Sequence, residues 1–195
     1  MLFPPPNDIS AILAATLRKD VPSPPRNKAA VLIALVRSER EGDYDLILTL
    51  RTETVEHHKG QVSFPGGAVD DADSDDIAAA LREAEEEVGI PASDIRILGT
   101  MDTIVASKHF LITPVVGYLD QKPRLSLQPH EVAEAFTVPL SFFSDPANET
   151  TEMRLVERLL RKVYCYRYGG FTIWGITGMI IRQFVQLLES EMRRE

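Results

Sequence analysis

The chain has 195 residues, of which 44% are hydrophobic and 26% are charged, a composition typical of one globular domain. Its formal net charge of −8 disfavours nucleic-acid binding because an acidic surface repels polyanions, although divalent cations can bridge acidic side chains to a small phosphorylated substrate. No apolar run is long enough to span a bilayer, no secretory signal is recognisable, and Cys165 is the only cysteine, so we expect a cytoplasmic protein without a membrane partner.

A short helix and a stiff connector are expected before the main domain. Asp8-Ile9-Ser10 can cap the helix, and the proline-rich stretch 22–25 ends it and leads into the rest of the chain. We therefore expect residues 1–28 to form an N-terminal helix and connector, and residues 29–195 to form a single domain.

The main domain is expected to begin with strands. Ala29–Val36 is a nearly continuous apolar run, which predicts a strand that is covered on both faces. The turn that follows and the apolar stretch Tyr44–Leu50 predict a hairpin. Gln61–Phe64 predicts a short strand that ends at Pro65-Gly66-Gly67.

Helices and strands then interleave irregularly, which predicts an α/β fold with a mixed sheet between helices. The expected elements are a helix over Asp75–Val88 that stops at Gly89, strands over Ile95–Val105, Phe110–Leu119 and Phe136–Phe143, a hairpin over Val163–Ile173, and an amphipathic helix over Thr177–Arg194.

The acidic helix is the most informative segment. Its apolar residues collect on one side, and Glu83, Glu86 and Glu87 fall within about 100° on another side. Like charges at this spacing repel each other, and a bound cation reverses the sign of that interaction. Carboxylate oxygens on a rigid helix suit Mg²⁺ or Mn²⁺, which also bind phosphate oxygens. For the acidic triplet alone, a solvated charged face is the alternative.

The segment and its upstream glycines resemble the Nudix family, whose box reads G-x5-E-x7-R-E-U-x-E-E-x-G-U, with U an apolar residue. The matching residues are Gly67, Arg82-Glu83-Ala84, Glu86-Glu87 and Gly89-Ile90. Asp73 stands where the first Glu of the box belongs, with one extra residue before Arg82. The resemblance implies that residues 29–195 are a Nudix hydrolase domain with an α/β/α sandwich fold.

The resemblance also implies the roles of the residues. Glu83, Glu86 and Glu87 would bind the metal, Arg82 would orient a carboxylate, and Asp73 would be the partner of Arg82. The metal would hold two linked phosphates and activate a water that attacks phosphorus. Glu131, which lies in a polar loop, would be a catalytic base or a further ligand, and a plain surface glutamate is the alternative.

Residues outside the box resemble the coenzyme A pyrophosphatase subfamily, whose pattern is roughly L-L-T-x-R-[ST]-x3-R-x3-G-x3-F-P-G-G. By this resemblance, Arg51, Lys59, Gly66 and Gly67 would contact the substrate. Glu56 stands where the pattern has its second arginine, and the neighbouring His57, His58 and Lys59 are candidate replacements.

Other functions stay open at this point. The alternatives are a Nudix hydrolase of ADP-ribose, NADH or dinucleoside polyphosphates, and a Nudix-fold binding module without turnover. We expect the alternating tyrosines Tyr164, Tyr166 and Tyr168 to be ordinary sheet residues rather than a surface on which adenine stacks. Cys165 is expected to be a small buried hydrophobic residue. We do not expect His57-His58 to form a zinc site. The oligomeric state is left open.

Overall fold

The computed structural model describes residues 2–16, 27–53, 59–106, 110–156 and 159–193. Its helices are α1 (Pro6–Ala15), α2 (Asp76–Val88), α3 (Leu140–Ser144) and α4 (Gly175–Met192), with short 3₁₀ turns at Ala92–Asp94 and Pro146–Asn148. Its strands are β1 (Asn27–Arg37), β2 (Tyr44–Arg51), β3 (Val62–Ser63), β4 (Gly66–Ala68), β5 (Arg96–Thr100), β6 (Ile104–Val105), β7 (Phe110–Leu119), β8 (Val132–Pro139), β9 (Glu149–Val156), β10 (Leu159–Tyr168) and β11 (Phe171–Trp174).

The strands form a mixed eight-stranded sheet and a separate antiparallel sheet of three strands in the order β11-β10-β9. In the large sheet β1 is central: it pairs antiparallel with β2 and β4 and parallel with β7. The register places Val31 opposite Gly66 and Ala30 opposite Gly67, so the glycine pair is fixed against the centre of the sheet.

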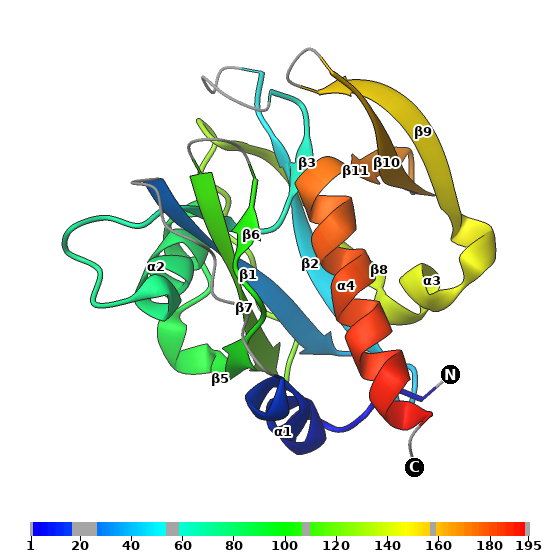
Figure 1. Ribbon diagram of the computed structural model, residues 1–195. Coiled ribbons are helices and arrows are strands. Elements are labelled where there is room, and N and C mark those ends of the chain that lie inside the picture. Colours follow the sequence, from blue (N-terminus) through cyan, green and yellow to red (C-terminus); the bar gives the residue numbers. More distant parts are fainter. Residues whose placement is uncertain (1, 17–26, 54–58, 107–109, 157–158, 194–195) are drawn as a thin grey trace.

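Two hydrophobic cores cover the two faces of the large sheet, which is why β1 is apolar along nearly its whole length. On one face, Ile33 and Leu35 pack in a core that includes residues of α1 and α4. On the other face, Leu32 and Ala34 pack with the apolar residues of α2. Figure 1 shows α1 and α4 on one side of the sheet. The expected α/β/α sandwich with a mixed sheet is therefore confirmed.

The N-terminal helix begins earlier than its expected cap at Asp8–Ser10. It starts at Pro6, where the fixed φ of proline suits the first turn, and no side chain caps it. Ile9 and Leu13 are buried against the main body. The division of the chain at residue 28 stays a prediction, and the proline-rich stretch 22–25 lies outside the described residues. No helix in the described part of the chain is both long and apolar enough to cross a membrane.

Other boundaries differ from the expected ones for local reasons. Ile95–Val105 is two strands that both pair with β7, because the four residue steps from Thr100 to Ile104 oppose only three steps of β7, from Val115 to Ile112, and the extra residue interrupts the pairing. The expected strand Phe136–Phe143 is β8 followed by α3. Asp43 stabilises that helix start, because its carboxylate accepts hydrogen bonds from the backbone N–H and the hydroxyl of Ser141 at 3.1 and 2.6 Å.

Two further strand assignments differ from the sequence-based ones. Gly66 and Gly67, expected to end a strand, themselves form β4 against β1. Strand β9 was not predicted, because its residues Glu149–Val156 are mostly polar and lack a regular apolar alternation. By contrast, the β1–β2 and β10–β11 hairpins and the final helix are confirmed.

Candidate active site

Helix α2 is the scaffold of the site, and its ends are fixed by local sequence. The Asp75 carboxylate accepts a hydrogen bond from the Ala78 N–H at 2.8 Å, which caps the first turn. Gly89 ends the helix with φ 70°, a left-handed conformation that glycine adopts without steric cost. The predicted helix is thus confirmed, and Ala80, Ala84 and Val88 are buried as expected.

Glu87 is a buried carboxylate at the end of this helix. It is 2% exposed, and it accepts hydrogen bonds from the backbone N–H of Gly66 at 3.2 Å and from Nη1 of Arg51 at 3.3 Å. Burial raises the pKa of Glu87 to about 7, and the two hydrogen-bond donors only partly oppose this effect. A buried carboxylate with incomplete compensation is well suited to bind a cation.

Glu83 lies one turn earlier and packs against the backbone of β4. A Cβ atom at Gly67 would lie 2.5 Å from Cδ and Oε1 of Glu83 and 2.6 Å from Oε2. The carboxylate therefore approaches the chain at a distance that only glycine allows. Burial also raises the pKa of Glu83, despite its ion pair with Nη1 of Arg82 at 2.9 Å.

Arg82 connects the acidic residues of this region. The Nε and Nη2 atoms of Arg82 donate hydrogen bonds to the Asp73 carboxylate at 3.1 and 3.0 Å. The same guanidinium forms an ion pair with Glu83 and a second one, 3.1 Å long, with Glu86. The side chain of Glu86 is 60% exposed. Because Arg82 stabilises the charged carboxylate, the pKa of Asp73 is lowered. The expected Asp73–Arg82 contact is therefore present, and it holds Arg82 where it can orient Glu83.

The loop that contains Glu131 is tied to the end of α2. The Gln128 N–H donates to the carbonyl of Glu87 at 2.9 Å, and the Thr52 N–H donates to the carbonyl of Glu131 at 2.9 Å. The negative charge of Glu131 contributes to the raised pKa values of both Glu83 and Glu87. Glu131 is therefore within electrostatic reach of both carboxylates.

The charge balance of this region is acidic. The carboxylates are Asp73, Glu83, Glu86, Glu87 and Glu131, and the cations among their direct partners are Arg51 and Arg82. This excess of oxygen ligands fits Mg²⁺ or Mn²⁺. In the described part of the chain, no three acidic, histidine or cysteine side chains are close enough to enclose an ion by themselves. An open half-site still suits Mg²⁺, which keeps several waters and takes phosphate oxygens as ligands.

The structure brings most of the expected site residues together. Arg51, Gly66 and Gly67 contact Glu87 or Glu83, as described above. Lys59, in contrast, is exposed and forms no ion pair with Glu83, Glu86 or Glu87. The expectations for Glu56, His57 and His58 fall outside the described residues.

The tyrosines and the cysteine of β10 lie in structural positions. Tyr166 is buried, and its hydroxyl donates to Glu149 at 2.9 Å. The ring of Tyr164 is covered by the guanidinium of Arg182, whose Cζ lies 4.2 Å from the ring centroid. Cys165 is buried, as expected.

Two features of the site were not found from the sequence. The first is the Arg51–Glu87 ion pair, which joins residues that are 36 positions apart. The second is the backbone pairing of Gln128 with the end of α2. Neither has a local pattern, although the polar stretch around Gln128 is a signal for a surface loop that could cover a helix end.

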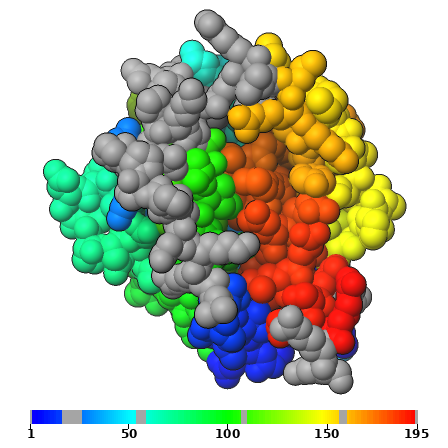
Figure 2. Space-filling model, in the orientation of Figure 1, coloured from blue at the N-terminus to red at the C-terminus, as the bar shows by residue number. Residues whose placement is uncertain are grey.

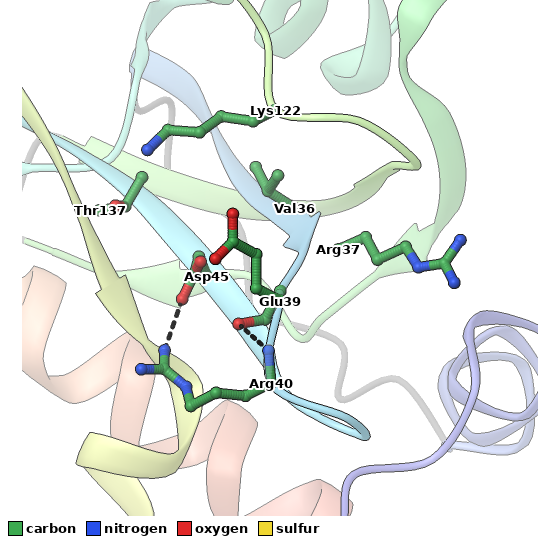
Figure 3. A pocket seen from close by; sticks show the side chains of 8 residues that line it. Val36, Arg37, Glu39, Arg40, Asp45, Lys122 and Thr137 are labelled. Carbon is green, nitrogen blue, oxygen red and sulfur yellow. Dashed lines mark hydrogen bonds and ion pairs between the residues drawn. The ribbon is translucent and has the colours of Figure 1, made fainter.

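A cleft of about 280 Å³, whose lining side chains Figure 3 shows, lies beside the turn between β1 and β2, whereas Arg51 is at the far end of β2. It is lined by Val36, Arg37, Ser38, Glu39, Arg40, Asp45, Lys122 and Thr137. Its charges are mixed, and Arg40 pairs there with Asp45 at 2.8 Å. It contains none of the expected site residues, so we do not assign the substrate to this cleft.

Comparisons with known proteins agree with this geometry. A family model described as the NUDIX domain matches residues 26–159. Over 179 residues the chain is 38% identical to an uncharacterized Nudix hydrolase, NudL, of Photorhabdus laumondii, with 87% of this chain and 92% of that protein covered.

Two solved structures have a similar fold. One is a C. elegans Ap4A hydrolase binary complex, with a TM-score of 0.54, 16% identity, and 87% of this chain and 99% of that chain covered. The other is the MutT protein from Methanosarcina mazei Go1, with a TM-score of 0.53, 20% identity, and 88% and 99% covered. At these identities the two likenesses establish the fold alone.

Proposed function

The chain belongs to the Nudix family of hydrolases, and from this premise we propose that it cleaves the diphosphate of coenzyme A or its acyl derivatives. The products would be 3′,5′-ADP and 4′-phosphopantetheine, with the acyl group retained on the second product. The observation that carries the proposal is the position of Arg51. This residue belongs to the upstream subfamily pattern, and it reaches the proposed metal ligand Glu87 at 3.3 Å.

We assign Glu83, Glu86 and Glu87 as the metal ligands. A bound Mg²⁺ or Mn²⁺ would neutralise the charge of the two phosphates and lower the pKa of a bound water. The protein fixes Glu87 through Gly66 and fixes Glu83 through Arg82 and the open space at Gly67. Glu86 is the most exposed of the three and therefore the most accessible to a cation that arrives with a substrate.

The other residues act on the substrate and the water. Glu131 lies within electrostatic reach of Glu83 and Glu87, and we assign it as the base that accepts a proton from the attacking water. Arg51 is 21% exposed, and a guanidinium group has five N–H donors, which can bind a phosphate through paired hydrogen bonds. Arg51 would thus hold one phosphate while the water attacks phosphorus in line.

A comparison of substrates tests this proposal. We would measure kcat/KM for coenzyme A, ADP-ribose, NADH and diadenosine tetraphosphate with Mg²⁺, and identify the products by mass spectrometry. Glu86→Gln is the matched control for contaminating phosphatases, because it removes one ligand charge from an exposed position. Coenzyme A should have the highest kcat/KM. A preference of tenfold or more for another substrate would refute the coenzyme A assignment and leave the Nudix chemistry intact.

The departure from the subfamily pattern at Glu56 provides a second test. Glu56→Arg restores the arginine of the pattern, and one added charge-assisted phosphate contact is worth about 1 kcal/mol at an exposed position. The substitution should therefore lower KM for coenzyme A several-fold. If the substrate is ADP-ribose or NADH instead, kcat/KM for that compound should fall in the same variant.

A further inference from the structure

Strand β9 forms an open sheet edge at the surface. In the described part of the chain, β10 is the only strand that pairs with it, and Figure 1 shows β9 as the outermost strand of the small sheet. The outer side of this eight-residue strand therefore presents backbone N–H and C=O groups that no described strand pairs with. Such an edge is a template for pairing with another strand.

Exposed apolar side chains lie beside this edge. Met153, Leu155 and Leu160 are 62%, 71% and 68% exposed. Alternate residues of a strand share a face, and Leu160 lies directly opposite Leu155, so the three side chains form one patch. In Figure 2 the gold and orange residues of this hairpin lie at the surface on one side of the molecule. Monomeric proteins usually protect a strand edge with charged or covering residues rather than with exposed leucines.

The charges of β9 are self-complementary about Met153. Glu152 and Arg154 flank it, and each side chain is 29% exposed. In an antiparallel pairing of two copies centred on Met153, Glu152 of each copy faces Arg154 of the other. A shift of the centre by one residue places either two Glu152 or two Arg154 side chains opposite each other, which is unfavourable. The charges therefore favour the register centred on Met153 over the two neighbouring registers.

We propose that two copies of this chain associate through antiparallel pairing of their β9 strands, centred on Met153. The pairing joins two three-stranded sheets into one continuous sheet. It joins the Glu152–Arg154 ion pairs of the two copies, 2.9 Å long in each, into one cluster of alternating charges, to which the Arg167 that also pairs with Glu152 adds a further positive charge from each copy. It also brings the two Met153 side chains into contact on the face that carries Leu155 and Leu160. None of the α2 carboxylates takes part, so the association is independent of the proposed hydrolysis.

A charge-exchange experiment tests the register. Glu152→Arg places arginine opposite arginine in the dimer, and Arg154→Glu places glutamate opposite glutamate. Each variant should sediment as a monomer at concentrations where the wild type sediments with twice the mass of one chain. Mixing the two variants restores opposite charges at both positions, and a heterodimer should form. Val105→Lys, at a residue that is 46% exposed on β6, is the matched control and should remain dimeric.

Two further measurements complete the test. Arg154 also packs on Trp174, with its Cζ 4.1 Å from the ring centroid, so its substitution affects a contact within the chain. Thermal unfolding of each variant therefore verifies that the variant is folded. Met153→Cys should form a disulfide-linked dimer under mild oxidation, since opposite residues of antiparallel strands have Cα atoms about 4.5–5.5 Å apart. Lys162→Cys, which is on β10 one strand further in, should not. A monomeric wild type, or a dimer that survives in both charge variants, would overturn the proposal.

Discussion

Replacing Gly67 by alanine should separate activity from stability. The added Cβ would lie 2.5 Å from Cδ and Oε1 of Glu83, whereas carbon atoms pack best at about 3.5–4.0 Å. The Glu83 carboxylate must therefore retreat by about 1 Å, and a misplacement of that size can cost about 100-fold in rate. Because the clashing atoms are the end of a flexible side chain, we expect kcat/KM to fall 10- to 100-fold with little change in melting temperature.

The neighbouring glycine is the matched control. Gly66 has φ 153°, and a Cβ there would lie 2.6 Å from Cα of Val31 and would also strike the carbonyl oxygen of Ala30. These are backbone atoms of the central strand and cannot move aside cheaply. Gly66→Ala should therefore destabilise the fold by about 1–3 kcal/mol, a loss of several degrees in melting temperature.

The assay compares both variants with the wild type by thermal unfolding and by kcat/KM at saturating Mg²⁺. We expect Gly67→Ala to be stable and slow, and Gly66→Ala to be unstable. Wild-type turnover in Gly67→Ala would show that the position of Glu83 does not control the reaction. An equal loss of stability in both variants would show that the space at Gly67 serves the fold instead.

Three further predictions concern the carboxylates. Burial raises the pKa of Glu87 from 4.5 to about 7, so the free energy of unfolding of the metal-free protein should fall by as much as about 3 kcal/mol as the pH rises through this range. Glu87→Gln removes this pH dependence and should also abolish activity. In EDTA, the melting temperature of the variant should exceed that of the wild type at pH 8 but not at pH 4. Asp73→Asn removes the charge that pairs with Arg82 and weakens the hydrogen bonds that position its guanidinium. In steady-state kinetics, kcat should therefore fall while KM changes little. Exhaustive EDTA treatment should abolish turnover, and Mg²⁺ or Mn²⁺ but not Zn²⁺ should restore it; full activity without metal would exclude the proposed role of the glutamates.

The sequence predicts best the parts of the site that local rules determine. The bounds of α2 follow from a side-chain cap, a 3.6-residue apolar period and a terminal glycine, and the box residues lie on that helix or in the segments that flank it. The Nudix resemblance read from these box residues is confirmed by the family model that matches residues 26–159. The Arg51–Glu87 pair, the β4 pairing of the glycines and the Asp43 bonds that start α3 all depend on contacts between distant segments, which no local pattern encodes.

The contact between Asp73 and Arg82 shows how tertiary geometry compensates for a departure from a motif. In this chain aspartate, which is one methylene shorter than glutamate, stands at the first acidic position of the box, and one residue is inserted before Arg82. The inserted loop turns back on itself: the Asp70 N–H donates to the Asp73 carboxylate at 2.8 Å, and the Asp73 N–H donates to the Asp70 carbonyl at 3.0 Å. The turn brings the shorter side chain to Arg82, so the extra residue offsets the missing methylene.

The two halves of the site are held with different rigidity. Glu83 and Glu87 are positioned by β4, which pairs with the central strand β1, and by a helix buried against the same sheet. Arg51 and Glu131 lie instead where strands pass into loops, at the end of β2 and just before β8. Side chains on sheets and helices are held more precisely than side chains on loops, and loops vary more easily. Substitutions in β4 or α2 should therefore slow turnover of every substrate, and substitutions after β2 or before β8 should change which substrate is preferred.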